Sequence, residues 1–138
     1  MSNVPANTDW FEAPDLSDEA VRRRLGPTGL TGFRNIMKVW GATGEEAQQL
    51  LGLAPGTSLD DLDPGRMSEE QMLRISYIIG IYKALHTYFG DEVADRWIGL
   101  ENRDARFGER RPLACMAEGG VDALREVRRM LDAWCAGN

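Results

Sequence analysis

Residues 68–89 restrict this chain to few folds, because they read as one long helix with apolar side chains on two sides. Ser68 begins a capping box with Gln71: the hydroxyl accepts from the Gln71 amide, and the Gln71 side chain accepts from the Ser68 amide. At 1.5 Å per residue this helix would extend roughly 30 Å. Because an element with two apolar faces is covered on both sides, we expect it at the centre of the fold. Its apolar residues are Ile75, Ile78, Ile79, Tyr82, Leu85 and Phe89 on one face, and Tyr77, Ile81 and Tyr88 on the other.

Glycine and proline divide the remaining sequence into further helical segments. We expect Gly26-Pro27 and Gly41 to end the first two helices. The residues from 54 to 67 are rich in Pro, Gly and Asp, which predicts a loop with at most one short helical turn. A ladder of small residues at Ser76, Gly80 and Ala84 would admit a neighbouring helix closely. Besides 68–89, the predicted helices start at Ser17 and Pro112 and cover 28–40, 43–51, 91–98 and 121–136.

The predicted fold is therefore all-α, a compact protein of about seven to eight helices. Residues 1–16 are expected to form a mobile N-terminal arm, whose apolar pair Trp10-Phe11 would lie on the body or on a partner. Residues 17–89 make one half, which includes the long central helix, and residues 90–138 make the other. The apolar face of the last helix is most simply core, with a partner-binding groove as the alternative.

Composition excludes several classes of protein. The chain has 138 residues, of which 43% are hydrophobic, enough for one core. Its longest apolar run, residues 75–82, is far shorter than the ~20 residues of a membrane helix. The first residues are polar and acidic, unlike a signal peptide, so we expect a soluble, cytoplasmic protein. Cys115 and Cys135 are expected to be buried thiols, with a disulfide as the alternative.

The sequence contains no catalytic motif, so we do not expect an enzyme. Nucleophilic catalysis needs a base beside a nucleophile, and His86 is the sole histidine. It shares a helix face with Tyr82 and Phe89, which is typical of a hydrogen-bonded histidine at the edge of a core. There is no Gly-rich phosphate loop, HExxH or GxSxG. No cofactor and no metal site are predicted, because neither cysteine belongs to a ligand cluster.

The order of aromatic, turn and apolar residues near the C-terminus is more specific. It runs Tyr88-Phe89-Gly90-Asp91, Arg96-Trp97-Ile98, Asn102, Phe107-Gly108, Pro112-Leu113 and Gly119-Gly120, followed by an amphipathic helix. This order resembles the toxin-binding domain of the Xre/MbcA/ParS antitoxins, which neutralise RES-domain toxins. Residues 30–90 resemble the helix-turn-helix half of the same family, so the resemblance covers about 110 of the 138 residues.

The resemblance implies an antitoxin of a type II toxin–antitoxin system that closes the NAD-binding cleft of a RES-domain, NAD-consuming toxin. Guanidinium groups suit a pocket that binds a pyrophosphate, because two of their N–H donors can bind one anionic group at the same time. The alternative for the arginine-rich loop is a solvated turn of mixed charge. The residues expected to contact the toxin are Asn102, Arg103, Asp104, Arg106, Arg110 and Arg111. Those expected to build the platform beneath them are Trp97, Phe107, Gly108, Pro112, Leu113 and Trp134.

Negative charge is concentrated where such a protein would read DNA. Residues 41–73 contain seven acidic residues and one basic residue, a net charge of −6 that equals that of the whole chain. Phosphate contacts supply most nonspecific DNA affinity, and residues 53–65 contain no Arg, Lys, Asn or Gln to read bases. We therefore expect DNA binding to be lost or weak. The candidates for a weak DNA contact are Arg22, Arg23, Arg24 and Arg66.

Three hypotheses of function remain: a toxin-binding antitoxin, a DNA-binding autorepressor of its own operon, and a helical adaptor unrelated to toxins. Antitoxins of this kind are generally dimers, so a homodimer is expected. Its interface would be the two-faced helix 68–89 or the apolar side of residues 28–40.

Overall fold

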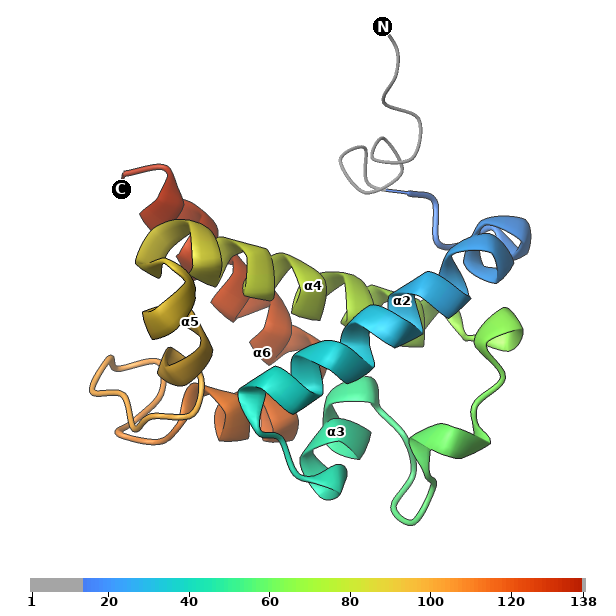
Figure 1. The fold of residues 1–138 in the computed structure, drawn as a ribbon, viewed down its shortest axis with the longest axis horizontal. Helices are drawn as coiled ribbons and strands as arrows, with labels where there is room; N and C mark the ends of the chain where they lie inside the picture. The colour runs from blue at the N-terminus through green and yellow to red at the C-terminus, as the bar shows by residue number, and fades with distance from the viewer. Residues whose placement is uncertain (1–13, 138) are drawn as a thin grey trace, which may run out of the picture.

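The computed structural model describes residues 14–137, and these form helices and turns without a β-strand (Figure 1). The all-α prediction is confirmed for this range. The predicted number of seven to eight helices is too high, because the described residues form five α-helices, and η1 and η2 are single 3-10 turns of three residues each. Most of the arm predicted for residues 1–16, including Trp10 and Phe11, lies outside the described residues. The elements are α2 (Glu19–Trp40), α3 (Gly44–Leu51), η1 (Leu59–Asp61), η2 (Pro64–Arg66), α4 (Glu69–Phe89), α5 (Asp91–Trp97) and α6 (Pro112–Cys135).

Helix α2 continues through Gly26-Pro27, where the sequence predicted an end. The Asp18 carboxylate accepts from the Ala20 amide at its start, and Gly41 closes it in the left-handed conformation. Proline inside a helix costs about 3 kcal/mol, since it removes one backbone hydrogen bond and crowds the preceding turn. The helix persists because its buried face is continuous across the proline, so tertiary packing outweighs that cost. The buried residues on this face are Leu25, Gly26, Gly29, Leu30, Phe33, Ile36, Met37 and Trp40.

The two C-terminal helices expected from the sequence join into one kinked helix, α6. Gly120 interrupts it with φ 70° and ψ −155°, a conformation open to glycine and strained for other residues. Pro112 occupies its first turn, where the missing amide hydrogen costs nothing. The sequence therefore predicted the position of the break correctly, but the two segments form one helix with a kink at Gly120.

Helix α4 is the central helix, packed against α2 and against α6 (Figure 1). The ladder of small residues admits α6 as predicted. A Cβ at Gly80 would overlap the Arg128 guanidinium, and the Cys135 thiol donates to the Ala84 carbonyl at 3.5 Å. The covering of α4 is incomplete, since the Tyr88 side chain at its end is 49% exposed. Five side chains of α4 are fully buried in the core: Met72, Ile75, Ile78, Ile81 and Leu85.

A single arginine ties α3 to α4. Arg74 Nη1 donates to the carbonyl oxygens of Gln49 and Leu50, at 3.2 and 3.3 Å, in the last turn of α3. Its Nε and Nη2 also bind the Glu70 carboxylate, at 3.0 and 2.9 Å. The last carbonyl groups of a helix have no partner within the helix, and a cation is favourable there. Arg74 therefore caps one helix from the surface of another.

No helix within residues 14–137 is both long enough and apolar enough to cross a membrane.

Candidate protein-binding surface

The loop between α5 and α6 has a defined conformation. The Asn102 amide donates to the Arg110 carbonyl at 3.0 Å, which closes the loop at its neck. The Asn102 side chain accepts from the Asp104 amide at 2.9 Å. The Phe107 ring is buried, and two consecutive residues with positive φ follow it, Gly108 and Glu109. Asn102, Phe107 and Gly108 therefore hold the shape of the loop, although Asn102 was expected among the toxin contacts and only Phe107 and Gly108 in the platform.

Beneath this loop lies a cluster of aromatic rings. Trp97 is its centre, with ring centroids 5.7 Å from Phe107, 5.9 Å from Phe89 and 6.2 Å from Trp134. Tyr88 extends the cluster to the surface, 5.3 Å from Trp134. The platform residues predicted from the sequence are thus brought together, and Pro112 and Leu113 are buried at the start of α6.

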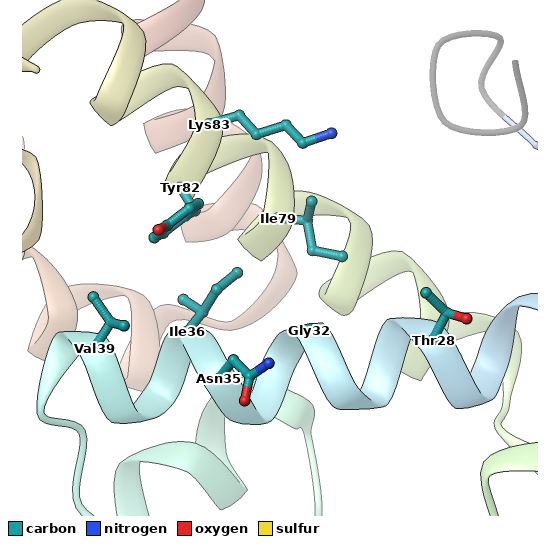
Figure 2. Close-up of a pocket in the computed structure, with 8 residues that line it drawn as sticks. All are labelled: Thr28, Gly32, Asn35, Ile36, Val39, Ile79, Tyr82 and Lys83. Atoms are coloured by element: carbon teal, nitrogen blue, oxygen red, sulfur yellow. The ribbon is translucent and has the colours of Figure 1, made fainter. Parts of the chain in front are cut away.

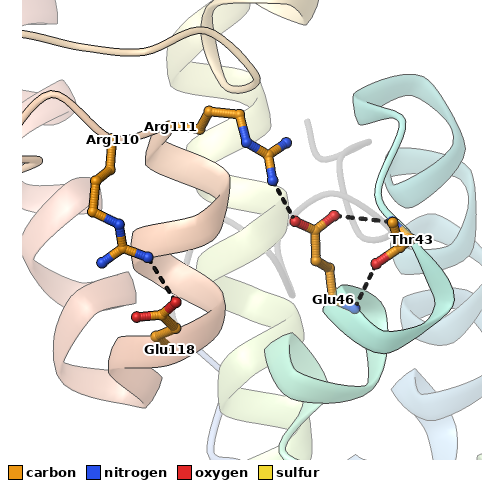
Figure 3. Close-up of polar contacts among 5 residues, drawn as sticks. All are labelled: Thr43, Glu46, Arg110, Arg111 and Glu118. Atoms are coloured by element: carbon orange, nitrogen blue, oxygen red, sulfur yellow. Dashed lines mark hydrogen bonds and ion pairs between the residues drawn. The ribbon is translucent and has the colours of Figure 1, made fainter.

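Most of the loop arginines are engaged within the fold. Arg106 Nη1 binds both oxygens of Asp104 at 3.0 Å. Figure 3 shows Arg110 turned toward α6, where Nη2 lies 2.6 Å from the Glu118 carboxylate. The side chain of Arg103 is exposed and forms no hydrogen bond or ion pair with any of residues 14–137. Arg103 is therefore the loop cation that remains available to a partner.

Arg111 points away from the loop toward α3 (Figure 3). Its Nη2 lies 2.7 Å from Glu46, which also forms the capping box with Thr43. Burial would raise the pKa of the Glu46 carboxyl, but the bonds from the Thr43 amide and from Arg111 outweigh it and hold the pKa below its usual value. Arg111 thus fastens the start of α6 to the first turn of α3, a contact between residues 65 positions apart.

A second set of exposed residues continues from Arg103 onto α5. Val93 is 41% exposed and Leu100 is 59% exposed. Arg96, between them, is also exposed and without a side-chain partner among residues 14–137. Because Ala94 and Ile98 are buried, the helix turns its opposite side outward. We name this surface the α5 face and define it as Val93, Arg96, Leu100 and Arg103.

The sequence reasoning found only Arg103 of the α5 face. Val93 and Arg96 are one turn apart on α5, whereas Leu100 and Arg103 belong to the loop that follows the helix, where helical spacing predicts nothing. An exposed apolar residue on a short helix cannot be told from a buried one by spacing alone.

His86 joins the end of α4 to α5. Its Nδ1 lies 2.8 Å from Asp91 and its Nε2 lies 2.7 Å from Asp95, with the Tyr82 ring stacked 4.2 Å away. A neutral imidazole has one donor, so only the cation satisfies both carboxylates. Burial would lower the pKa of His86, but the hydrogen bonds to Asp91 and Asp95 outweigh it and raise the pKa. The prediction of a hydrogen-bonded histidine at the core edge is confirmed.

We expect His86→Gln to destabilise the protein in a pH-dependent way. Since the pKa is raised in the folded state, the stabilisation is complete below the unfolded value of about 6.5 and is lost as pH rises through the folded pKa. The variant should lose about 1 kcal/mol at pH 6 and clearly less at pH 9.5. Urea denaturation at both pH values measures the difference. An equal loss at the two pH values would mean that the imidazolium charge is not what holds α5.

The arginines predicted as candidates for a weak DNA contact lie on α2 and η2, not on α5 or its following loop. Arg22 donates to the carbonyl oxygens of Met67 and Leu16, at 3.1 and 2.9 Å. Arg23 pairs with Glu19, and Arg66 with Asp63. Arg22, Arg23 and Arg66 do gather around one polar cavity of about 430 Å³. Arg24 is exposed on the same helix.

The segment where a recognition helix would stand contains only η1 and η2, of three residues each. Asp60 in η1 pairs with Arg34 of α2 at 3.1 Å, which holds this acidic segment against the body. Within residues 14–137 there is thus no second helix of a helix-turn-helix to enter a groove of DNA.

Cys115 and Cys135 are free thiols, so the disulfide alternative does not apply. Cys135 is exposed, contrary to the expectation of two buried thiols, because it lies in the last turn of α6. Residues 14–137 contain no group of three or more side chains able to hold a metal ion.

Comparison with protein-family models, with curated proteins and with solved structures gives no match for this chain.

Proposed function

We propose that this protein is the antitoxin of a type II toxin–antitoxin system, which binds a RES-domain, NAD-consuming toxin in the cytoplasm and blocks its cleft. The observation that carries the proposal is the α5 face. Two of the four large apolar side chains exposed in the described residues, Val93 and Leu100, belong to the same short segment as two exposed arginines without a side-chain partner there, and a third, Tyr88, is part of the aromatic cluster. Apolar anchors with arginine are typical of protein interfaces.

The rigidity of the surface supports the proposal further. Binding costs less when the contacting loop is already ordered, because less conformational entropy is lost. The loop is closed by the Asn102–Arg110 bond, seated by the buried Phe107 ring, and fastened to α3 through Arg111. Of the residues predicted to contact the toxin, we therefore assign Arg103 to direct contact. We assign Asn102, Asp104 and Arg111 to holding the loop.

Leu100→Asp with Arg103→Glu should weaken toxin binding at least about 30-fold, since each change removes or reverses a central contact. Calorimetric titration of the purified chain with a RES-domain toxin encoded beside its gene measures this, and NAD consumption by the toxin reports inhibition. The control is Arg129→Glu on α6, whose side chain is 68% exposed and paired only with Glu126. If the double variant binds and inhibits like the control, the α5 face is not the toxin-binding surface.

Two alternatives make different predictions. The gathering of Arg22, Arg23 and Arg66 favours a weak autorepressor, and gel-shift experiments with DNA upstream of the gene at low salt would test it. We expect no tight, sequence-specific band, since these arginines already have acidic or carbonyl partners. A helical adaptor unrelated to toxins would bind no RES-domain protein. Light scattering of the purified chain tests the proposed homodimer.

A further inference from the structure

An apolar groove runs between α2 and α4 (Figure 2). Its volume is about 340 Å³. Figure 2 shows Ile79 and Tyr82 of α4 opposite Ile36 and Val39 of α2. Gly32 of α2 contributes no side chain, and a Cβ there would lie 3.7 Å from Ile79 Cδ1. Val39 is 45% exposed at the edge of the groove. The groove therefore offers an apolar surface on which apolar side chains could be buried.

The described part of the chain begins next to this groove. Pro14, the first described residue, lines a neighbouring hollow between α4 and α6. Ile79 and Lys83 line both the hollow and the groove. The residues that precede Pro14 therefore start from a hollow that adjoins the groove. At 3.3–3.6 Å per residue, the four residues from Pro14 back to position 10 span up to about 14 Å.

Those preceding residues match the groove in chemistry. The sequence there is Asp9-Trp10-Phe11-Glu12, an apolar aromatic pair flanked by two carboxylates. The groove is apolar, and the ammonium group of Lys83 stands at its rim (Figure 2). Burying an aromatic side chain removes about 150–250 Å² of surface from water, which favours docking of the pair. A tether of a few residues also gives an effective concentration in the millimolar range.

We propose that residues 9–12 dock into the α2–α4 groove of the same chain, with Trp10 and Phe11 in the groove and a flanking carboxylate near Lys83. This contact would cover the apolar side of α2 that the sequence offered as a dimer interface. It does not depend on the proposed function, because the α5 face lies on other elements.

Fluorine NMR of the full-length chain labelled with 5-fluorotryptophan tests the docking. The chain has four tryptophans, and loss of one resonance in Trp10→Phe assigns Trp10. We expect the Trp10 resonance to show a smaller shift between H₂O and D₂O than in the urea-unfolded chain. Val39→Glu and Lys83→Glu should each move it toward the unfolded position, because the first adds charge to the groove and the second repels the carboxylates.

The control for these variants is again Arg129→Glu, which should leave the Trp10 resonance in place. Unchanged Trp97 and Trp134 resonances show that a variant is folded. Full solvent sensitivity of Trp10 in the unmodified chain would overturn the proposal. So would a protected Trp10 that responds to neither groove variant, since the segment would then lie elsewhere. A Trp10 shift that depends on protein concentration would assign the groove to a second copy and also overturn it.

Discussion

Gly26→Ala is expected to lower the free energy of unfolding by about 3 kcal/mol, although alanine normally stabilises a helix by up to ~1 kcal/mol over glycine. The reason is a close approach of two backbones. A Cβ at position 26 would overlap the Pro64 carbonyl oxygen and lie 3.1 Å from its carbon. Neither α2 nor η2 can yield as a flexible side chain would. Urea denaturation at neutral pH measures the loss.

Gly32→Ala on the same helix is the matched control. Its Cβ would lie 3.7 Å from Ile79 Cδ1, an ordinary contact, so this variant should be neutral or more stable. Proline also disfavours a helical conformation at the residue before it, which adds to the cost of alanine at position 26. Repeating Gly26→Ala in a Pro27→Ala background separates the two effects. If the loss disappears there, the Pro64 contact is not its cause.

Arg74→Met should lower the free energy of unfolding by about 3 kcal/mol. Methionine retains most of the apolar stem of the side chain but removes the guanidinium. The Arg74 side chain is only 12% exposed, and its guanidinium binds the Glu70 carboxylate and two backbone carbonyl groups of α3. The carbonyl groups of Gln49 and Leu50 would lose a donor, and hydrogen bonds to charged groups contribute about 1.5–3 kcal/mol each. The end of α3 should separate from α4 first. Hydrogen exchange at the amides of α3 would report this loosening alongside the change in stability.

Arg129→Met provides the comparison for Arg74→Met. Arg129 is exposed and its ion pair with Glu126 spans 3.4 Å, so its loss should cost less than about 0.5 kcal/mol. Arg74→Lys keeps the charge without the planar fork and should be intermediate. If Arg74→Met and Arg129→Met have the same effect, the helix-capping role of Arg74 is excluded.

Gly26→Ala and Arg74→Met also separate effects on folding from effects on the proposed binding. Gly26 and Arg74 contact η2 and α3, whereas the α5 face stands on α5 and its following loop. At a temperature where the variants remain folded, their affinity for a toxin should be unchanged. The double change at Leu100 and Arg103 should behave in the opposite way, because both side chains are exposed and lack partners in the described fold.

Local signals in the sequence predicted most helix boundaries correctly. The capping boxes at Thr43 and Ser68 both form, and Gly41 and Gly52 close their helices in the left-handed conformation. Caps are predictable because donor and acceptor lie within four residues of each other. The continuity of α2 through Pro27 was not predictable in this way. It depends on burial against α4 and η2, which are distant in the sequence.

The candidate site was predicted in part. The sequence predicted a binding surface after Trp97, which stays a prediction, and an aromatic platform, of which the rings of Trp97, Phe107 and Trp134 lie together. It could not tell which arginines were free. Arg111 pairs with Glu46 and Arg110 pairs with Glu118. The charged residues of the loop do not by themselves indicate which of them pair with acidic groups on other helices. The sequence also did not predict which side of α5 is exposed, because that depends on contacts with elements that are distant in the sequence.

By itself, the sequence determined that this chain is helical, that residues 68–89 form its central helix, and that acidic charge gathers before that helix. These properties follow from periodicity, capping and composition, which act over a few residues. Only the tertiary structure decided that α2 is continuous, that three of the four loop arginines are paired, and that Val93, Arg96, Leu100 and Arg103 share an exposed face. Each of these depends on which surface of one element another element covers, and that choice is made over the whole chain at once.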